Sequence, residues 1–549
     1  MKKRIMLMMV FSIVGLTIIL GGTPINKVCE ASGATEMRGV WIAYVDFYKL
    51  GLKNKSEATF RKNAGVFLDK AKKNNVNTVF FHVRAFDDAV YKSKTFDMSE
   101  DIWSLNSKIP YDPLDVMVEL THKKDMAIHG WMNPYRITTN YYLDPAKTAT
   151  NNRIVTAAKE VMAHKVDGIH FDDYFYHAGK GYKDVNGKVT IYKSKEPSSG
   201  KKKAYVNKMV SSVYKNVNAI KPSVKFGISP QGNIENCRNS GGDIDKWMSK
   251  TGYIDYIIPQ IYWTDQWGSS GKITMFSDRL KAWQKLNKRK MPIYIGLALY
   301  RTATKYSDDI GWKAKNTNLY SQLKLLRGAG CKGFVLFSGQ DLNRSSAQRE
   351  LEYLNYGITG QPVKTSMKTY YVNSKAIRLK WNKVSGAKGY QIWRATREKG
   401  KYAMVKTITP NTMLTYNNTN LTPGKRYYYK VRTYNKSSSG KIRYGNYSSV
   451  KYRSAVPQES KLSLATGYKK IKVKWSRVPY ASGYVIYRAT SKNGTYKMEK
   501  TVDSGSATEY LNTGLTKGTR YYYKIRAFEK EKGKRIYGPY SDYASMVSK

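Results

Sequence analysis

The sequence contains few cysteines and few acidic residues for its length. Three cysteines in 549 residues exclude a disulfide-stapled scaffold, and 40 Asp+Glu against 95 Lys+Arg give a formal net charge of +55. It has no Gly-rich phosphate loop, no HExxH pair and no Cys/His cluster. We therefore expect no required metal or cofactor. Apart from Ile5–Leu20, no segment is long and apolar enough to cross a bilayer.

The N-terminus has the composition of an export signal. Basic residues at positions 2–4 precede the apolar run Ile5–Leu20, and small residues follow it, with cleavage expected after Ala31 or Ala34. We expect residues 1–34 to be a signal peptide, so that the protein is secreted and wall-associated with no membrane span after cleavage; a retained N-terminal anchor is the alternative. A charge this large indicates an anionic partner, and export favours acidic wall polymers over nucleic acid.

The last third of the chain is a tandem repeat. Ile377-Arg-Leu-Lys-Trp381 recurs 94 residues later as Ile471-Lys-Val-Lys-Trp475. Within each unit apolar and polar residues alternate, which is typical of strands with one buried face. The order of a Trp, a Gly-Tyr pair and a Leu-x-x-Gly-x-x-Tyr motif resembles fibronectin type III modules. Two all-β fibronectin type III-like sandwiches are therefore expected, at residues 363–455 and 457–549.

Residues 35–358 have a different sequence pattern, in which short apolar runs alternate with stretches whose apolar residues are spaced by three and four. Eight such β/α units predict a (β/α)8 TIM barrel, with a doubly wound open sheet as the alternative. No Gly-rich loop follows the first run, which favours the barrel. The apolar runs are Gly39–Val45, Thr78–Val83, Ala127–Trp131, Gly168–Phe171, Lys225–Ile228, Tyr256–Ile258, Pro292–Gly296 and Gly333–Phe337.

The residues near the ends of these runs and just after them are candidates for a binding site, because the active site of a TIM barrel lies at the C-terminal ends of its strands. They are rich in aromatic rings, which stack on sugars, and in amides and carboxylates, which hydrogen-bond hydroxyl groups. This composition indicates a carbohydrate site. Trp41 and Tyr44, in the first run, fit the core and the site equally well. The substrate-binding candidates are Asp46, Arg84, Asp88, Tyr91, His129, Trp131, Asn133, Tyr135, Arg136, His170, Tyr174, Ser229, Gln260, Trp263 and Tyr300.

Asp172 and Asp173, at the end of the fourth run, are the strongest catalytic candidates, because most glycosidases need two carboxyl groups. Adjacent strand residues point to opposite faces, so both reach one site only where the chain leaves strand geometry. An adjacent acid pair is typical of substrate-assisted hexosaminidases, in which the substrate's N-acetyl group is the nucleophile. The pairing raises the pKa of the acid that must start protonated.

In this hypothesis Asp172 polarises the acetamido group, Asp173 is the general acid/base and Tyr262 hydrogen-bonds the developing oxazoline. The two Asp roles exchanged are an alternative. A rival mechanism makes Asp172 the nucleophile and takes its acid from a more distant residue: Asp88, Glu235 or Asp265.

Seven motifs, in order along residues 37–350, resemble the glycosyl-hydrolase-like family 10, also called domain of unknown function 187. The resemblance implies a TIM-barrel glycoside hydrolase, and some members resemble enzymes that cut peptidoglycan glycan strands stripped of their peptides. The chain departs from the family pattern at Gln231–Glu235, which lacks the expected aromatic residues. The motifs are Met37-Arg-Gly-Val-Trp-Ile42, Asp88-Ala-Val-Tyr91, Asp112-Pro-Leu114, His129-Gly-Trp-Met-Asn-Pro-Tyr-Arg136, Val166-Asp-Gly-Ile-His-Phe-Asp-Asp-Tyr-Phe-Tyr176, Lys225-Phe-Gly-Ile-Ser-Pro230 and Pro259-Gln-Ile-Tyr-Trp263.

The sequence therefore favours an exported hydrolase of a peptidoglycan-type, N-acetylated glycan. A catalytically inactive wall-binding or adhesion protein and a hydrolase of another polysaccharide are the alternatives. The basic character lies mainly in residues 363–549, where 40 Lys+Arg against 8 Asp+Glu give +32. We expect these modules to tether the protein to anionic wall polymers, with a merely solvated basic surface as the alternative.

Overall fold

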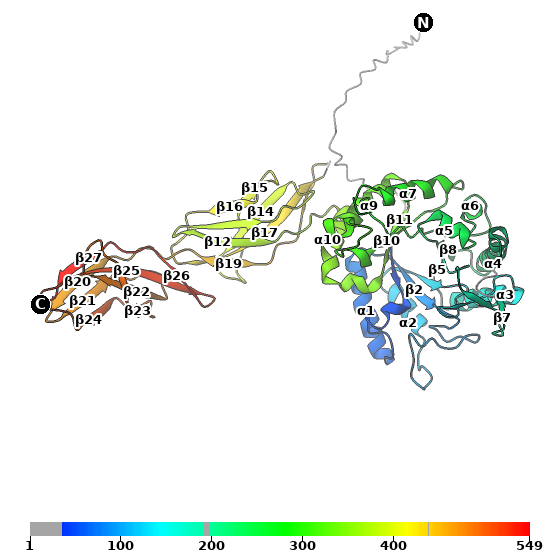
Figure 1. Ribbon diagram of the computed structural model, residues 1–549, viewed down its shortest axis with the longest axis horizontal. Coiled ribbons are helices and arrows are strands. Elements are labelled where there is room, and N and C mark those ends of the chain that lie inside the picture. The colour runs from blue at the N-terminus through cyan, green and yellow to red at the C-terminus, as the bar shows by residue number, and fades with distance from the viewer. Residues whose placement is uncertain (1–35, 192–196, 438) are drawn as a thin grey trace, which may run out of the picture.

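The computed structural model describes residues 36–191, 197–437 and 439–549. It consists of a barrel domain followed by two sandwich domains in a row towards the C-terminus (Figure 1). The predicted signal peptide, residues 1–34, lies outside the described residues. Within the described ranges, no helix is both long and apolar enough to cross a membrane.

The barrel is built from eight parallel strands. They are β1 Met37–Ile42, β2 Thr78–Arg84, β3 Ala127–Met132, β5 Gly168–Asp172, β8 Lys225–Ser229, β9 Tyr256–Ile257, β10 Ile295–Ala298 and β11 Gly333–Phe337. Their hydrogen-bonded order is β10-β11-β1-β2-β3-β5-β8-β9. Parallel bridges from Ile257 to Ile293 and from Gln260 to Gly296 join the two outer strands, and thus close the sheet on itself. The predicted TIM barrel is confirmed, and each of the eight predicted runs overlaps one of these strands.

The strands are mainly apolar because both of their faces are buried. Every residue of β2, β5 and β10 is buried, one face packing inside the barrel and the other against the surrounding helices. The helices around the barrel are α1 Glu57–Lys73, α2 Pro113–His122, α3 Thr148–Ala163, α4 Ser199–Ile220, α5 Ile234–Asn239, α6 Ile244–Trp247, α7 Met275–Leu286, α8 Gly311–Ala314, α9 Asn318–Gly328 and α10 Gln348–Thr359, with the 3-10 turns η1 Tyr44–Asp46, η2 Leu299–Arg301, η3 Gly339–Asn343 and η4 Ser345–Ala347.

Helix α1 shows how local sequence sets these helices. The Oγ of Ser56 accepts a hydrogen bond from the Thr59 N–H and so caps the helix start. Lys70, Lys72 and Lys73 fill its last turn, where they complement the helix dipole. Its buried residues recur at spacings of three and four, as an amphipathic helix requires: Phe60, Ala64, Phe67, Leu68 and Ala71.

The loops after β3 and β5 carry a small additional sheet. Its strands are β4 Tyr141–Leu143, β6 Gly181–Lys183 and β7 Val189–Ile191, hydrogen-bonded in that order. Because both loops leave the C-terminal ends of barrel strands, the sheet stands on the face of the barrel where TIM-barrel sites lie.

Each C-terminal module is a two-sheet sandwich, and the predicted fibronectin type III-like fold is confirmed by the strand order. In the first, β12-β13-β16 faces β15-β14-β17-β18, with β19 also paired to β17; the second repeats this arrangement with β20-β21-β24 and β23-β22-β25-β26, with β27 on β25. The strands are β12 Met367–Asn373, β13 Ala376–Trp381, β14 Gly389–Ala395, β15 Ala403–Ile408, β16 Thr415–Asn418, β17 Arg426–Lys436, β18 Ile442–Tyr444 and β19 Lys451–Ser454, then β20 Leu462–Gly467, β21 Lys470–Trp475, β22 Gly483–Ala489, β23 Lys497–Val502, β24 Glu509–Thr513, β25 Arg520–Glu531, β26 Lys534–Tyr537 and β27 Ala544–Val547.

The repeated sequence motifs build equivalent cores. Trp381 packs on Tyr390 with ring centroids 5.4 Å apart, and Trp475 packs on Tyr484 at 5.2 Å. The hydroxyl of Tyr427 accepts a hydrogen bond from the backbone N–H five residues before it, as does that of Tyr521. This tyrosine corner explains the Leu-x-x-Gly-x-x-Tyr motif of each module.

Side-chain contacts join the three domains. Tyr353 and Tyr356 of α10 belong to the hydrophobic core of the first sandwich, and the Tyr356 hydroxyl donates to the Gly386 carbonyl oxygen at 3.3 Å. Between the sandwiches, the buried carboxylate of Glu531 accepts hydrogen bonds from Arg453 and from the Tyr371 hydroxyl, each at 3.2 Å. The sandwiches therefore pack against the neighbouring domains and are not joined to them by linkers alone.

Candidate active site

A cavity of about 260 Å³ opens where the barrel strands end. This volume is just below the range of about 300–1,000 Å³ for ligand pockets. The walls come from the C-terminal ends of β1, β2, β3, β5, β8 and β11 and from the segment after β9. The lining residues are Trp41, Ala43, Tyr44, Val45, His82, Trp131, Asn133, Arg136, Asp172, Asp173, Tyr174, Ser229, Gln260, Tyr262 and Phe337.

Asp172 and Asp173 both reach this cavity because β5 ends between them. Asp172 is the last residue of the strand and only 7% exposed, and the chain bends at Asp173, whose carbonyl oxygen accepts from the Phe175 N–H at 2.8 Å. The Asp172 Oδ1 accepts two hydrogen bonds of 2.9 Å, from the Asp173 N–H and from the Gln260 Nε2. Gln260 also donates to the Ser229 carbonyl oxygen at 2.8 Å, which fixes the direction of its amide.

A hydrogen bond from the Asp173 N–H to the Asp172 Oδ1 joins the two residues, and their surroundings shift the pKa values of the two carboxyl groups by different amounts. Burial, followed by the charge of Asp172, raises the pKa of Asp173 well above its usual range. Burial also raises the pKa of Asp172, but hydrogen bonds from Asp173 and Gln260 and the charge of Arg136 oppose this. The surroundings thus favour the proton on Asp173 over Asp172.

Aromatic rings form the walls on either side of the acid pair. The His82 and Trp131 rings stack at 3.7 Å with an interplanar angle of 11°, and Tyr262 faces Phe337 at 6.0 Å and 28°. Burial, followed by the neighbouring Asp172 charge, raises the pKa of Tyr262 well above its usual range, so its hydroxyl remains a hydrogen-bond donor. Flat apolar faces beside a few polar groups are suited to a sugar ring.

A buried hydrogen-bonded network lies beneath the cavity. The Tyr256 hydroxyl is 2.8 Å from His129 Nδ1 and 3.2 Å from His170 Nδ1, and His170 Nε2 is 3.0 Å from Ser229 Oγ. Burial lowers the pKa of His129 to about 4 and that of His170 well below its usual range. Both imidazoles are therefore neutral and position the strand ends from below.

The sequence model of the family described as Glycosyl hydrolase-like 10 matches residues 36–141 and 135–314, which together span half of the chain. The chain belongs to this family. The match covers the strands that carry the acid pair and the lining residues of β1, β2, β3, β5 and β8.

Two curated relatives have similar sequences. Glycosyl hydrolase YngK of Bacillus subtilis strain 168 is 27% identical over 523 residues, covering 80% of this chain and 98% of that protein. Glycosyl hydrolase DigH of Escherichia coli strain K12 is 27% identical over 384 residues, covering 58% of this chain and 86% of that protein. Among solved structures, a segment of two fibronectin type III domains from chicken tenascin matches 34% of this chain and 99% of its own length, with 16% identity and a TM-score of 0.25.

In this glycosyl hydrolase-like 10 barrel, half of the predicted site residues line the cavity. The members brought together are Asp172, Asp173, Tyr262, Trp131, Asn133, Arg136, Tyr174, Ser229 and Gln260. The remaining predicted residues do not line it, and each has a different environment in the structure.

Two of these support loops next to the cavity. Arg84 is fully buried, pairs with Asp87 at 2.5 Å and donates to the Asn133 carbonyl oxygen at 2.7 Å, so it holds the loop after β3. Asp46 accepts from the Ser338 Oγ at 2.9 Å and from the Ala43 N–H at 3.1 Å, which ties the end of β1 to the end of β11.

The other predicted residues are packed away from the cavity. Asp88 accepts from the Phe86 N–H at 3.2 Å, and the Tyr91 hydroxyl donates to Glu160 at 3.3 Å. His129 and His170 belong to the network beneath the cavity. The remaining members are packed against the barrel core: Tyr135, Trp263 and Tyr300.

The distant acids of the rival mechanism do not line the cavity either. Asp88 accepts the hydrogen bond from the Phe86 N–H that is described above. Glu235 is exposed at the start of α5 and forms an ion pair with Arg238. Asp265 accepts from the Ser277 N–H at 2.8 Å and caps the first turn of α7.

Sequence reasoning missed the cavity residues Ala43, Val45, His82 and Phe337, and left Trp41 and Tyr44 undecided between core and site. Ala43, Val45 and Phe337 have no distinctive chemistry. His82 could have been found from the sequence, because it is a polar ring in the otherwise apolar run from Val79 to Val83 and thus an unusual residue for a core position.

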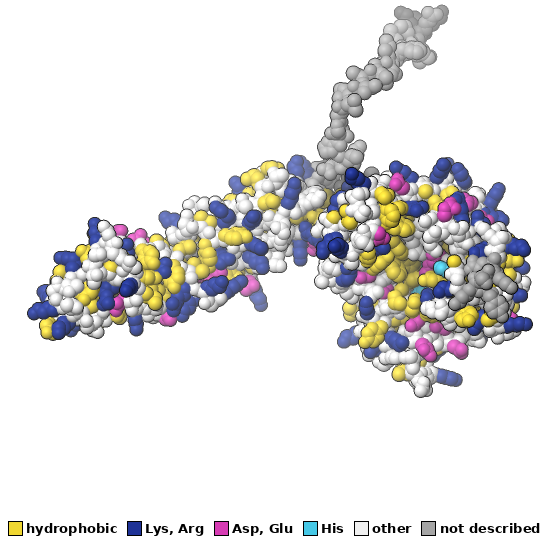
Figure 2. Space-filling model, viewed as in Figure 1, with side chains coloured by type: hydrophobic (Ala, Val, Ile, Leu, Met, Phe, Trp, Pro, Cys, Tyr) yellow, Lys and Arg dark blue, Asp and Glu magenta, His cyan; other side chains and the backbone are white. Residues whose placement is uncertain are grey.

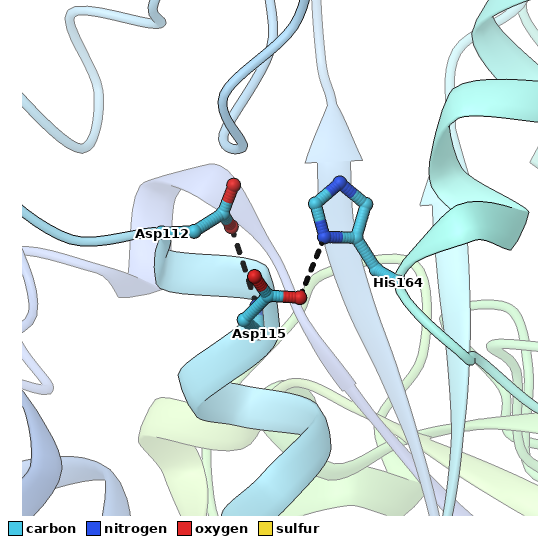
Figure 3. A group of neighbouring side chains, drawn as sticks. All are labelled: Asp112, Asp115 and His164. Atoms are coloured by element: carbon cyan, nitrogen blue, oxygen red, sulfur yellow. Dashed lines mark hydrogen bonds and ion pairs between the residues drawn. The ribbon is translucent and has the colours of Figure 1, made fainter.

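One acidic cluster in the described part of the chain has the ligand types of a metal site. Asp112, Asp115 and His164 lie close together at the start of α2 (Figure 3). Their contacts account for them without an ion. Asp112 caps α2 by accepting from the Asp115 N–H and also accepts from the Lys92 N–H, and His164 Nδ1 is 2.7 Å from Asp115 Oδ1. None of the three lines the cavity. That the protein requires no metal or cofactor stays a prediction.

Proposed function

We propose that the protein is an exported glycoside hydrolase that cleaves glycosidic bonds in a peptidoglycan-type, N-acetylated wall glycan. The observation that carries this proposal is the hydrogen-bonded pair Asp172–Asp173 in an aromatic-walled cavity at the C-terminal end of the barrel. Membership of the glycosyl hydrolase-like 10 family and the names of the two relatives support the hydrolase part.

The arrangement favours the substrate-assisted mechanism. Ionised Asp172 accepts a hydrogen bond from the acetamido N–H of the substrate, and the acetamido oxygen forms a bond to the anomeric carbon. The bond from that carbon to the leaving oxygen breaks, and Asp173 gives that oxygen its proton. Tyr262 donates a hydrogen bond to the oxazoline. Water then attacks the anomeric carbon, Asp173 takes its proton, and the acetamido group is restored.

The partners of the two carboxylates support these roles over the exchanged ones. The group that polarises the amide must be ionised, and Asp172 has the hydrogen bonds from Gln260 and the charge of Arg136 to favour its anion. The acid must start protonated, and Asp173 has the strongly raised pKa. Since Asp88, Glu235 and Asp265 are all outside the cavity lining, the paired mechanism is also favoured over one with a distant acid.

Hydrolysis of purified, peptide-free glycan strands by Asp172→Asn and Asp173→Asn variants tests the proposal. Each change should lower kcat by about 10²–10⁴-fold, the range for loss of a positioned acid/base group. Glu235→Gln, an exposed acid near the same loop, is the matched control and should retain wild-type activity. Full activity of Asp173→Asn would refute the paired mechanism.

A wall-binding protein without activity is the second candidate, and the basic sandwiches are the observation that favours it. Figure 2 shows Lys and Arg side chains spread along both sandwiches, with few Asp and Glu among them. We propose that these modules bind anionic wall polymers whether or not the barrel is active. Wall binding by the wild type with no release of new reducing ends from any glycan would establish the inactive alternative.

A further inference from the structure

A polar groove of about 580 Å³ lies at the junction of the barrel domain and the first sandwich, where α10 meets the chain that leads into β12 (Figure 1). It is more than twice as large as the cavity of about 260 Å³ at the strand ends, and it falls within the range of about 300–1,000 Å³ for ligand pockets. Among the described residues its lining includes four basic side chains and no acidic one, and most of the others carry hydroxyl or amide groups. The basic members are Arg349, Lys364, Lys383 and Lys451.

Three of these four cations have no counterion. The Arg349 guanidinium is paired with the Glu352 carboxylate, with Nη1 and Oε2 2.8 Å apart. The exposed ammonium groups of Lys364, Lys383 and Lys451 form neither an ion pair nor a hydrogen bond within the part of the chain that the structure describes. Three uncompensated positive charges around one groove raise the local concentration of anions there.

The groove is formed before any ligand binds, because side-chain contacts hold its walls together. Arg349 Nη1 donates to the Lys364 carbonyl oxygen at 3.0 Å, which fixes the linker against α10. Thr365 Oγ1 donates to the Asn382 carbonyl oxygen at 2.7 Å, and Asn382 Nδ2 donates to Ser366 Oγ at 2.9 Å. These bonds join the linker to the end of β13, so a ligand loses little affinity to ordering the site.

A second groove, of about 440 Å³, extends the positive charge along the linker. It is also lined by Lys364, and it adds Lys70 and Lys73 of α1. Glu352 is the acidic member of its lining, and the ion pair with Arg349 already neutralises that carboxylate. The two grooves together present cations in succession, which suits a chain with repeated negative charges better than a single small anion.

We propose that the junction groove binds a phosphodiester chain of the polyol phosphate type through Lys364, Lys383 and Lys451. This rests on the part of the proposed function that assigns an anionic wall polymer to the basic modules. Lysine binds phosphate as a point charge, whereas the arginine fork, which matches a carboxylate, is already occupied by Glu352 in this groove. Because both domains line the groove, the bound chain contacts the barrel domain as well as the sandwich.

The first test compares two full-length variants of equal net charge. Lys364→Gln, Lys383→Gln and Lys451→Gln together remove the groove lysines. The matched control changes three exposed lysines of the same sandwich that line neither groove, at positions 375, 399 and 406, to Gln. Calorimetry at low salt measures binding of a synthetic glycerol phosphate oligomer. The control should bind like the wild type, and the groove variant at least tenfold more weakly, the scale of three ion pairs that each contribute a few-fold.

The outcomes separate this site from the tether of the proposed function. Equal weakening in both variants would show that diffuse charge binds the chain, so the site would be overturned while the tether stood. A wild type that sedimented with walls but did not bind the oligomer would overturn the phosphate assignment alone. A wild type that bound neither would overturn both.

The second test uses the wild type and needs no variant. Acetylation of lysines followed by mass spectrometry measures how accessible each ammonium group is. The glycerol phosphate oligomer should protect the three groove lysines several-fold and leave the three control lysines unchanged. Polyglutamate and single-stranded DNA of equal charge are the comparison ligands. Equal protection of the groove by polyglutamate would contradict a phosphate site, and tighter binding of DNA than of the oligomer would contradict a polyol phosphate ligand.

Discussion

At the scale of single residues, Gln260 lies where it can set the pH range of the reaction. It does not belong to the acid pair, but its Nε2 donates to Asp172 at 2.9 Å and thereby lowers the pKa of that carboxyl group. In the proposed mechanism, activity on the acidic side is lost when Asp172 takes up a proton. On the alkaline side it is lost when Asp173 gives up its own, which its raised pKa delays beyond the ordinary carboxyl range. Gln260 is thus a positioning residue.

Gln260→Leu should therefore move the acidic limb of the kcat/KM profile to higher pH. A hydrogen bond to a charged group contributes about 1.5–3 kcal/mol, and one pH unit corresponds to about 1.4 kcal/mol, so the shift should be about one to two units. The alkaline limb should move less. The pH–rate profile of Gln340→Leu, a glutamine near the end of β11 outside the cavity lining, is the control. An unchanged acidic limb in Gln260→Leu would mean that Asp172 does not titrate in that limb.

The position of the acid pair in the cavity could be predicted from sequence, because the two carboxylates stand at the end of an apolar run and active sites of TIM barrels lie at the ends of the strands. The environments of Arg84 and Asp46 could not. Arg84 contacts Asp87, which also binds Arg153, 66 residues further along the chain, and Asp46 contacts Ser338 across the closure of the barrel. Sequence position at a strand end does not distinguish a side chain that faces the cavity from one that holds a neighbouring loop.

At the scale of elements, glycines inside the barrel strands make room for the network beneath the cavity. A Cβ at Gly227 of β8 would lie 2.2 Å from the ring of Tyr256, and one at Gly168 of β5 would lie 2.3 Å from the ring of His129. Both rings belong to the network that runs to Ser229. The glycines thus allow rings on neighbouring strands to lie flat against the backbone.

Gly227→Ala should destabilise the barrel and reduce activity together. Overpacking of this kind costs about 1–3 kcal/mol, and the ring of Tyr256 must move, which displaces His129 and His170 beneath the acid pair. Gly65→Ala is the matched control. Its Cβ would meet nothing within 4 Å in the interior of α1, so it should stabilise the protein by about 0.5–1 kcal/mol. Urea unfolding and kcat measure both, and a Gly227→Ala variant as stable as the wild type would contradict the role of this glycine.

The eight barrel strands could be predicted because a strand that is buried on both faces has a mainly apolar sequence. The sheet of β4, β6 and β7 was not predicted. Its strands have three residues each, too few for a periodic pattern, and Tyr141–Leu143 pairs with Gly181–Lys183 only because two loops meet above the barrel. The sandwiches were predictable from the repeat, whose aromatic positions fall on the buried faces of β13, β14 and β17 and of their counterparts.

At the scale of the whole molecule, the packing of the two sandwiches buries acidic residues and leaves a basic outer surface. The sandwiches hold +32 of the net charge of +55, and they are joined to the barrel and to each other through packed contacts. Glu529 and Glu531 are among the few acids of these modules, and both are buried between the two sandwiches, against Arg426, Arg453 and Ser454. The interface thus uses two of the eight acids, which leaves the outer surfaces still more basic.

A surface of this kind should bind an anionic wall through long-range electrostatic attraction, which salt screens. Changing four exposed lysines of the second sandwich (Lys461, Lys470, Lys497 and Lys500) to Glu lowers the charge of the two modules from +32 to +24. In a sedimentation assay with purified walls, this variant should bind several-fold more weakly at low salt and equally at high salt, where both proteins are released. Lys→Arg changes at the same positions keep the charge and should bind like the wild type.

The same variant separates tethering from catalysis. Short soluble glycans do not need a tether, so their hydrolysis should be unchanged, whereas hydrolysis of insoluble walls should fall with binding. If the Lys→Glu variant bound walls as tightly as the wild type at every salt concentration, the basic surface would be merely solvated. If it bound weakly but cleaved walls at the wild-type rate, the tether would exist without limiting the reaction. The basic sandwiches are thus expected to determine where the protein acts, and the acid pair in the barrel to determine which bond it cleaves there.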